Sequence, residues 1–376
     1  MNVRYPLFFL IFVFQVSLYA HINSDRYESS PEDIINSGVV PEEIARPEAI
    51  MHVSEAMKAF VHEHISMETT RLDRLNRLLD LLVSEDKFGF RYEYDKTLTA
   101  EEAFEQRCGN CLTFSILTAA LARELDLDVY FNSVETTPAW ETLGDLVTEE
   151  YHMNLLARVG ADYYVVELLP YFRNLTIRAE TQADSVAFGR YYNNLGVWAI
   201  SENKPQLAEA YFKQAIRVDL TCHPAWRNLG ALKRMQGAWK EAKICLERAA
   251  AIRPKSDIIY QMLAQTCTDL GEMTKAAHYE KLMEDYRKSN PMYHFAVGQK
   301  SMIAGDLKEA KRHLKKAISL NPDCHYFYYA LACVYEREHD YSHMREALEQ
   351  ALKCSATDSA QDTYSQIIAS LPTELR

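Results

Sequence analysis

The first half of this chain is organised around one short stretch, residues 107–114, which reads RCGNCLTF. Its glycine predicts a turn, and the apolar, alanine-rich run at residues 116–125 predicts a buried helix directly after it. Cys111 therefore stands where that helix would begin. The N-terminus of a helix presents free N–H groups and a partial positive charge, both of which stabilise a thiolate. The stretch thus predicts a nucleophilic cysteine.

Helical patterns lead up to this stretch. Apolar residues recur at helical spacing over residues 50–65 and again over residues 70–83. A further short helix is expected to begin after Thr99, because Thr99 suits an N-cap and Glu102 stands at the capping-box position. That helix would deliver the chain to Cys108.

Strand-like patterns follow the cysteine. Three strands are predicted, at residues 128–135, 151–159 and 162–169. Residues 136–149 are expected to form a loop, and Gly160-Ala161 predicts the turn between the last two strands. His152 and Asn154 fall on the more polar face of the middle strand. The cysteine helix is therefore followed by an antiparallel sheet that carries a histidine.

The length of the turn decides which residues of this sheet can meet. With a two-residue turn at Gly160-Ala161, Asn154 lies opposite Glu167, and His152 is one diagonal step away. Diagonal neighbours on one face are about 7–8 Å apart at the backbone, within reach of long side chains. A turn of odd length would point Glu167 to the other face. An even turn makes a His152–Glu167 pair possible.

The second half of the chain is a repeat with a period of 34 residues. Five units begin near residues 189, 223, 257, 291 and 325. Each unit predicts a helix pair with small residues where the helices touch, so that Gly196 returns as Gly230. The third unit is the weakest, because Glu280 stands where a large apolar residue is usual. The pattern is that of the tetratricopeptide repeat (TPR), an all-α solenoid expected over residues 189–358, with residues 359–376 as capping helix and tail.

The first half also resembles a known family. Gly109-Asn110-Cys111, followed by an alanine-rich helix, resembles the transglutaminase-like superfamily of cysteine enzymes, whose core is papain-like. Trp140 after a proline and the run His152-Met153-Asn154 are similar to bacterial members. The resemblance covers roughly residues 50–175 and implies an α+β domain, bounded here as residues 49–180. We expect this transglutaminase-like domain to precede the all-α TPR solenoid.

The resemblance implies cysteine chemistry on peptide or protein amides. Cys111 would be the nucleophile and His152 the acid and base. Glu167, or failing it Asn154, would hold the imidazole in the right tautomer, although the family usually has Asp in the third position. Water would then complete hydrolysis or deamidation, as in a cysteine protease or amidase, and an amine would complete transamidation. The sequence does not choose among these outcomes.

An oxyanion site would complete this chemistry. The Cys111 backbone N–H would supply one donor, and a side chain just upstream, Gln106 or Asn110, would supply another. No cofactor and no metal are expected. His62-Glu63-His64 points its two imidazoles in different directions on a helix, and it lacks the spacing of a zinc-binding His-Glu-x-x-His motif.

The repeats predict a protein or peptide partner. The first helices of the units would line a concave face. Four polar residues near that face are candidates for gripping a peptide carboxylate: Asn193, Arg227, Asn228 and Arg234. The favoured function is therefore a cysteine hydrolase or acyl transferase whose TPR solenoid binds substrate or partner.

Two rival functions remain open. In one, the chain is a non-catalytic adaptor or scaffold with an inactive transglutaminase-like domain. In the other, Cys108 and Cys111 form a thiol redox pair. A disulfide between these two cysteines would also disable Cys111 as a nucleophile.

The N-terminus predicts export. Arg4 precedes an apolar run over residues 5–14, and Ala20 ends a segment that matches a secretory signal peptide of residues 1–20. Residues 21–48, which contain several prolines, are expected to be a loose lead-in. The protein would be periplasmic or secreted, and it would contact a membrane only if the N-terminal segment stays uncleaved as an anchor.

The composition also limits which classes of partner are expected. A chain of 376 residues with 48% hydrophobic residues is long enough for two folded domains. Its formal net charge is -12, and it contains no long basic run. Binding to a phosphate backbone needs a concentrated cationic surface, so nucleic acid is not expected as a partner.

Overall fold

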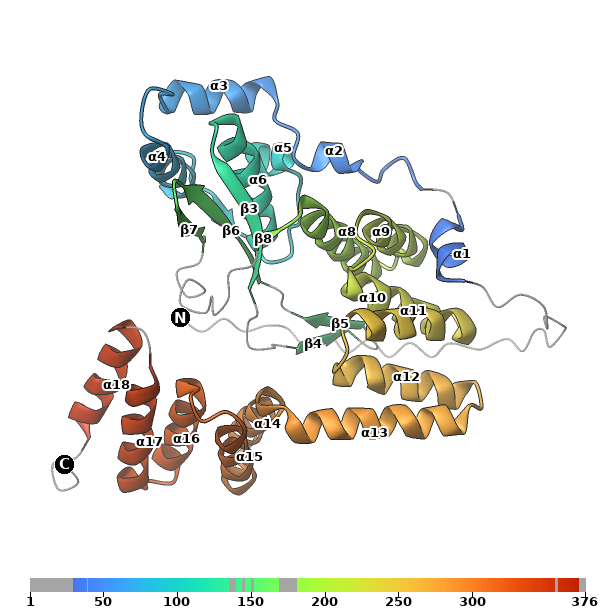
Figure 1. Ribbon diagram of the computed structural model, residues 1–376, viewed down its shortest axis with the longest axis vertical. Helices are drawn as coiled ribbons and strands as arrows, with labels where there is room; N and C mark the ends of the chain where they lie inside the picture. Colours follow the sequence, from blue (N-terminus) through green and yellow to red (C-terminus); the bar gives the residue numbers. More distant parts are fainter. Residues whose placement is uncertain are drawn as a thin grey trace, which may run out of the picture.

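The computed structural model describes residues 30–38, 40–134, 140–143, 146–149, 152–168, 181–355 and 358–371. An α+β part occupies one end, and helix pairs fill the rest of the molecule (Figure 1). The segment predicted to be a signal peptide lies outside the described residues. Among the helices that are described, none is both long and apolar enough to cross a membrane.

The described part of the chain begins with helices, of which the first packs on the repeats and the others belong to the α+β part (Figure 1). These helices are α1 (Pro31–Asn36), α2 (Pro47–Ile50), α3 (Glu55–His64), α4 (Arg71–Val83), α5 (Ala100–Gln106) and α6 (Cys111–Glu124). The helix α5 begins with the predicted capping box, in which Thr99 accepts from the Glu102 N–H and the Glu102 carboxylate accepts from the Thr99 N–H. The helix α6 is the central one, because its residues 112–122 are all buried.

Within the described residues, the strands form one sheet of four strands and two sheets of two strands. The strands are β1 (Arg91–Tyr92), β2 (Cys108–Gly109), β3 (Asp128–Val134), β4 (Trp140–Leu143), β5 (Leu146–Glu149), β6 (His152–Val159), β7 (Asp162–Val166) and β8 (Thr181–Gln182). The main sheet has the order β7-β6-β3-β8 and packs against α6. The strands β6 and β7 pair antiparallel with Val159 opposite Asp162, so the turn at Gly160-Ala161 has the predicted two residues.

Two parts of the sequence interpretation need correction. The expected loop at residues 136–149 contains the hairpin of β4 and β5. The expected loose lead-in contains a helix: Ser30 caps α1, and Ile34 and Ile35 of this helix are buried. The helix α1 packs on the repeats, since Arg217 donates to the Ile35 carbonyl at 2.6 Å. Neither feature has a clear periodic signal, because each segment is short.

The repeats form helix pairs. The second to fifth pairs begin at the residues that the period predicted, whereas the first begins at Asp184, ahead of the predicted residue 189. The pairs are α8 (Asp184–Ser201) with α9 (Pro205–Val218), α10 (His223–Met235) with α11 (Trp239–Ile252), α12 (Asp257–Asp269) with α13 (Met273–Ser289), α14 (Pro291–Ile303) with α15 (Leu307–Leu320), and α16 (His325–Arg337) with α17 (Tyr341–Cys354). The helix α18 (Asp358–Ser370) packs on α17, at the predicted capping position. Gly230 lies at a helix contact, because an added Cβ there would sit 2.7 Å from Leu246.

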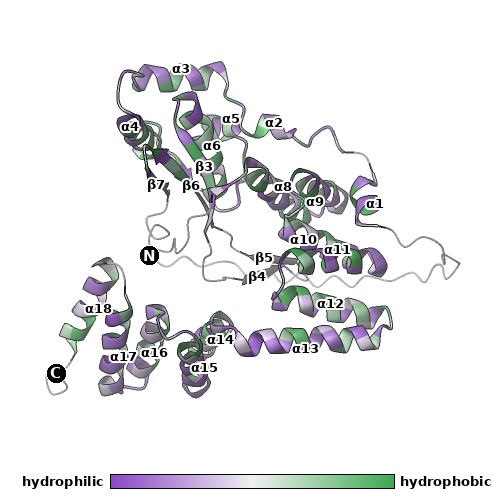
Figure 2. Cartoon of the chain, viewed as in Figure 1, coloured by the Kyte–Doolittle hydropathy of each residue, from purple (hydrophilic) through white to green (hydrophobic). Residues whose placement is uncertain are grey.

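The hydrophobic core is not continuous through the repeats. One buried cluster runs from Ile34 in the lead-in to Leu263 in α12, and a second begins at Phe295 in α14. Between them, α13 buries only Ala276 and makes little contact with α14. Figure 2 shows α13 as a long helix in which hydrophilic and hydrophobic residues alternate along its visible side. The weak third unit thus divides the array into two packed parts.

Candidate thiol site

Cys111 is the first residue of α6 and is half-buried. Asn110 is the N-cap of this helix, and its side-chain oxygen accepts from the Thr113 N–H at 3.0 Å. The first turn therefore presents its remaining N–H groups around the cysteine. Ser115, one turn later, donates to the Cys111 carbonyl at 2.9 Å and to the Met153 carbonyl at 3.2 Å. The bond to Met153 fixes the cysteine helix against β6, the strand that carries His152.

His152, Glu167 and Asn154 meet as the even turn predicted. Nε2 of His152 contacts Oε2 of Glu167 directly, and Nδ2 of Asn154 donates to the same carboxylate oxygen at 3.1 Å. Asn132 on β3 donates to the Asn154 side-chain oxygen at 2.7 Å. The His152 side chain is 4% exposed and that of Glu167 only 1%. These side chains form a buried series of hydrogen bonds that runs from Asn132 on β3 through Asn154 on β6 to Glu167, just after β7. The series ends at the His152 imidazole.

The imidazole also interacts with Cys111. Burial alone lowers the pKa of a histidine, but hydrogen bonding to the Cys111 sulfur and to the Glu167 carboxyl outweighs burial and raises the pKa of His152 to about 9. At neutral pH this arrangement favours an imidazolium between a sulfur and a carboxylate. Such a pairing is the electrostatic requirement for a thiolate nucleophile.

The two candidates for the second oxyanion donor, Asn110 and Gln106, lie in different environments. Asn110 is buried, with its oxygen in the helix cap and its Nδ2 donating to Thr97 at 2.7 Å. Gln106 is the last residue of α5 and is exposed. Between them, Gly109 has φ +154°, and an added Cβ would sit 2.3 Å from a Thr113 methyl carbon. The chain passes so close to α6 at this point that only glycine fits without a shift.

Cys108 lies apart from this arrangement. It is buried on β2, and its sulfur accepts from Lys96 Nζ at 3.4 Å. Lys96 also pairs with Glu93 at 2.9 Å. Both Cys108 and Cys111 are free thiols in this structure.

The two histidines of α3 have separate partners. His62 contacts Glu124 at 3.1 Å, and Nδ1 of His64 contacts the Phe60 carbonyl at 2.8 Å. Within the described residues, no group of three or more His, Cys, Asp or Glu side chains is arranged to hold a metal ion.

The four candidate peptide-binding residues of the repeats are buried. Arg227 and Asn228 of α10 are 2% and 1% exposed. Asn228 donates to Asn193 of α8 at 3.0 Å, and Arg234 donates to Gln265 of α12 at 3.1 Å. These side chains therefore join neighbouring first helices, and strand β5 lies against α10.

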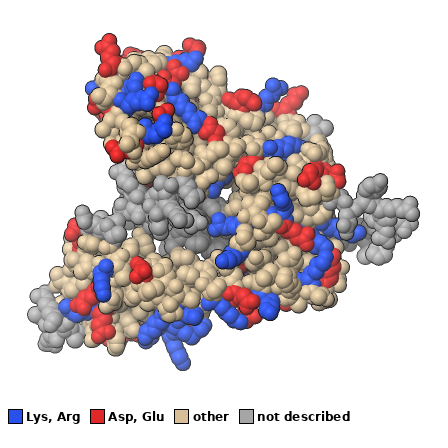
Figure 3. Space-filling view, viewed as in Figure 1, with Lys and Arg blue, Asp and Glu red and all other residues tan. Residues whose placement is uncertain are grey.

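Charged side chains of both signs lie outside the thiol site. Lys, Arg, Asp and Glu side chains intersperse on the face seen in Figure 3. Burial, the largest cause, and the positive charges of Arg253, Arg227 and Arg190 lower the pKa of His223 to about 2.

Sequence reasoning missed Asn132, Thr97 and Thr113. Thr113 donates to the Lys96 carbonyl at 3.1 Å and accepts from the Leu98 N–H at 2.9 Å, which ties residues 96–98 to the cysteine helix. Polar residues within otherwise apolar elements were the available signal, because a buried hydroxyl or amide requires a partner.

The repeats are of the tetratricopeptide kind. The family model for the tetratricopeptide repeat matches residues 189–222, 298–324 and 325–358. Among curated proteins, no match to the chain was found.

Solved TPR structures are similar to part of the chain. YrrB, described as a TPR protein with an unusual peptide-binding site, is 19% identical with a TM-score of 0.25, over 47% of this chain and 91% of its own. A thermophilic TPR protein from Thermus thermophilus, TTC0263, is 19% identical with a TM-score of 0.27, over 48% of this chain and 99% of its own. The Cut9–Hcn1 complex of the APC/C is 21% identical with a TM-score of 0.26, over 48% of this chain and 36% of its own.

Proposed function

We propose that this chain is a protein-binding TPR protein whose α+β domain is a transglutaminase-like cysteine enzyme acting on peptide or protein amides. The single observation that supports the chemistry is the connected series Cys111, His152, Glu167, in which a cysteine at a helix N-terminus faces an imidazole whose other side is held by a carboxylate. The TPR family match supports the binding role.

The reaction begins with proton transfer within the pair. His152 holds the proton of Cys111, and the resulting thiolate attacks the amide carbonyl to form a C–S bond. The carbonyl oxygen gains negative charge near the Cys111 N–H, with Gln106 or Asn110 as the second donor. His152 then gives its proton to the nitrogen as the C–N bond breaks. The products are a free amine and a thioester on Cys111.

The second half regenerates the cysteine. His152 takes a proton from water or from an acceptor amine, which attacks the thioester carbon. The C–S bond then breaks, and Cys111 leaves as the thiolate beside the imidazolium of His152. Water yields hydrolysis or deamidation, whereas an amine yields transamidation. Glu167 keeps the imidazole oriented throughout, and Asn154 holds Glu167 through its amide.

In this proposal the repeats select the substrate or partner. The match to the tetratricopeptide-repeat model supports this binding role. Asn228 and Arg234 are buried and join neighbouring first helices through Asn193 and Gln265, so they shape the repeat array that would present the binding surface. We also propose export to the periplasm or the cell exterior, with anchoring if the N-terminal segment is retained. Detection of mature chains that begin after residue 20 in a periplasmic or culture fraction would test this.

Thiol labelling tests the chemistry. Iodoacetamide is expected to modify Cys111 faster than each of the other cysteines at pH 7, as followed by peptide mass spectrometry. H152A should slow this modification at least tenfold, because the imidazole no longer takes the proton. H64A is the matched control, since His64 is exposed and bonded to its own helix. Equal labelling of all exposed thiols, unchanged by H152A, would overturn the proposal.

A second candidate function is a non-catalytic scaffold. It is favoured by one observation: the family match is confined to the repeats. In this case C111A would retain the full biological role of the protein, whereas the enzyme proposal expects C111A to lose it while partner binding by the repeats persists.

A further inference from the structure

The helix that begins with Cys111 is held at both ends by the first helix of the repeats. At its N-terminal end, Asn194 of α8 donates to Thr97 Oγ1 at 3.4 Å, and the same oxygen accepts from Asn110 at 2.7 Å. At its C-terminal end, Arg123 donates to both carboxylate oxygens of Asp184, at 2.6 and 2.8 Å. The helix α8 therefore spans the length of α6.

The N-terminal contact reaches the cap of the cysteine helix. Asn110 uses its oxygen to cap the Thr113 N–H and its amide nitrogen to bond Thr97. Its rotamer is thus set from both sides. Because the cap orients the N–H groups of the first turn, a change at Thr97 alters the field at Cys111.

The C-terminal contact fixes the opposite end. Arg123 donates through two nitrogens to Asp184 at the start of α8, and one of these nitrogens also donates to the Val129 carbonyl of β3 at 3.2 Å. Two-pronged guanidinium–carboxylate pairs fix direction as well as distance. The pair is partly exposed, so its role is to orient α6 more than to stabilise the fold.

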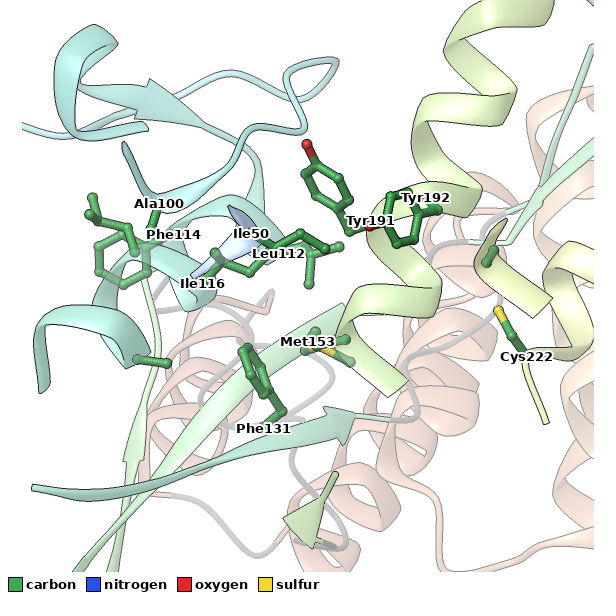
Figure 4. Close-up of a cluster of buried hydrophobic side chains, with 14 of the residues drawn as sticks. Ile50, Ala100, Leu112, Phe114, Ile116, Phe131, Met153, Tyr191, Tyr192 and Cys222 are labelled. Carbon is green, nitrogen blue, oxygen red and sulfur yellow. The ribbon is translucent and has the colours of Figure 1, made fainter. Parts of the chain in front are cut away.

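Apolar packing fills the space between the two contacts. Tyr191 and Tyr192 of α8 lie beside Leu112 and Ile50 in one buried cluster (Figure 4). Tyr192 also donates to the Ala45 carbonyl at 2.6 Å. The core of the α+β part thus continues into the first repeat, and α6 and α8 behave as one packed unit.

We propose that α8 is a positioning element of the thiol site, acting through Asn194 and Asp184, so that the repeat array sets the reactivity of Cys111. This inference rests on the proposed function, because it assigns α8 a role in that same site. A route to α8 from the rest of the array exists: Asn193, next to Asn194, accepts from Asn228 of α10.

The test measures the rate of iodoacetamide modification at Cys111 against pH in the full chain. N194L removes the donor to Thr97, and D184A removes the carboxylate from Arg123. Each is expected to lower the rate at pH 7 about two- to fivefold: N194L through the cap of the first turn of α6, and D184A because α6 is no longer held in direction against β6. The rate limit at high pH should stay unchanged, because the thiolate itself is intact.

Two controls separate positioning from general loosening. N76L changes an exposed asparagine on α4, and E272A breaks the Lys243–Glu272 pair of the second and third repeats at 2.7 Å. Neither should move the pH profile. If N194L does not fold, the comparison rests on D184A, on R123A and on their double variant, which should slow the reaction no more than either single change.

The outcomes distinguish this inference from the proposed function. If H152A slows modification but N194L, D184A and R123A match the controls, positioning by α8 is wrong and the enzyme proposal stands. If H152A has no effect but the α8 variants move the pH profile, the enzyme proposal fails and positioning stands. Equal effects of the α8 variants and the controls would overturn the inference.

Discussion

Asn154 donates to the same Glu167 oxygen that contacts the His152 imidazole. The last pair of β6 and β7 is Leu155 with Val166, and Asn154 and Glu167 are the next residues on either side. This amide–carboxylate contact decides how the histidine is held. Asn132 in turn fixes Asn154, so the geometry of the site is supported from the middle of the sheet.

The first prediction concerns this contact. N154L should slow iodoacetamide modification of Cys111 and lower the unfolding free energy by about 1–3 kcal/mol, because Glu167 and Asn132 each lose a buried partner. N76L, at an exposed position on α4, is the control and should change neither the modification rate nor the unfolding free energy. Chemical denaturation with peptide-level labelling measures both. A variant as stable and as reactive as the wild type would contradict the role given to Asn154.

The second prediction follows from the raised pKa of His152, about 9 in the fold against an ordinary value of 6.5. A raised histidine pKa stabilises the fold fully below pH 6.5, and this contribution is lost as the pH rises through 9. The unfolding free energy should therefore decline between these limits, and it should decline less in E167Q. Equal pH slopes for the two proteins would contradict the pairing.

The third prediction concerns Gly109. G109A should lose at least about 2 kcal/mol of stability, because its Cβ would meet Thr113 at 2.3 Å and its φ is +154°. Gly160 is the matched control: it has φ +65°, and nothing lies within 4 Å of an added Cβ. G160A should therefore cost only about 1–2 kcal/mol. Thermal unfolding compares the two, and an equal cost would show that the close passage is unimportant.

A pair of histidines joins α14 to α15 at the boundary between the two parts of the array. Nδ1 of His294 and Nδ1 of His313 are 2.9 Å apart. Arg312 donates to Nε2 of His313 at 2.7 Å, and Nε2 of His294 faces the Lys288 carbonyl at the end of α13. These contacts suit two neutral imidazoles, of which His313 donates to His294.

The fourth prediction is acid sensitivity at this boundary. Burial lowers the pKa of both histidines, and nearby Arg312 also lowers that of His313, while Glu309 opposes it. A lowered histidine pKa leaves stability unchanged above about pH 6.5 and removes it as the pH falls below that value. Hydrogen exchange in residues 286–320 should therefore accelerate at pH 5 beyond its intrinsic change. H294Q should reduce this acceleration, whereas H278Q, at an exposed position on α13, should not. The same acceleration in H294Q would contradict the assignment.

The fifth prediction concerns cooperativity. Since the core is divided between α12 and α14, denaturation should occur in two steps, with residues 291–371 exchanging separately from the rest. Pulse-labelled hydrogen exchange in urea measures this directly. A single transition shared by all helices would show that α13 couples the two parts despite its exposure.

Much of this architecture was readable from the sequence. The constant period located the helix pairs, and the even turn at Gly160-Ala161 predicted that Asn154 would lie opposite Glu167. One local feature of the sequence indicated that the array is divided, namely Glu280 in the third unit. The extent of this division could not be predicted, because it depends on how little α13 packs against α14.

Other features depend on contacts between distant segments. The pairing of Asn132 with Asn154 requires the register of β3 against β6, which the long connection between these strands leaves open. The bond from Asn194 to Thr97 joins residues 97 positions apart. Local periodicity carries no information about such partners, whereas tertiary packing determines them.

The most direct test of the thiol–imidazolium pair is the rate of Cys111 modification at pH 6 relative to pH 8. An ordinary thiol loses about 100-fold in thiolate between pH 8 and pH 6. The account predicts a smaller fall for Cys111, because the His152 imidazole, with a pKa of about 9, is protonated at both pH values, and it predicts that H152A restores the steep dependence. A wild-type Cys111 whose rate falls about 100-fold, with H152A behaving identically, would contradict the account.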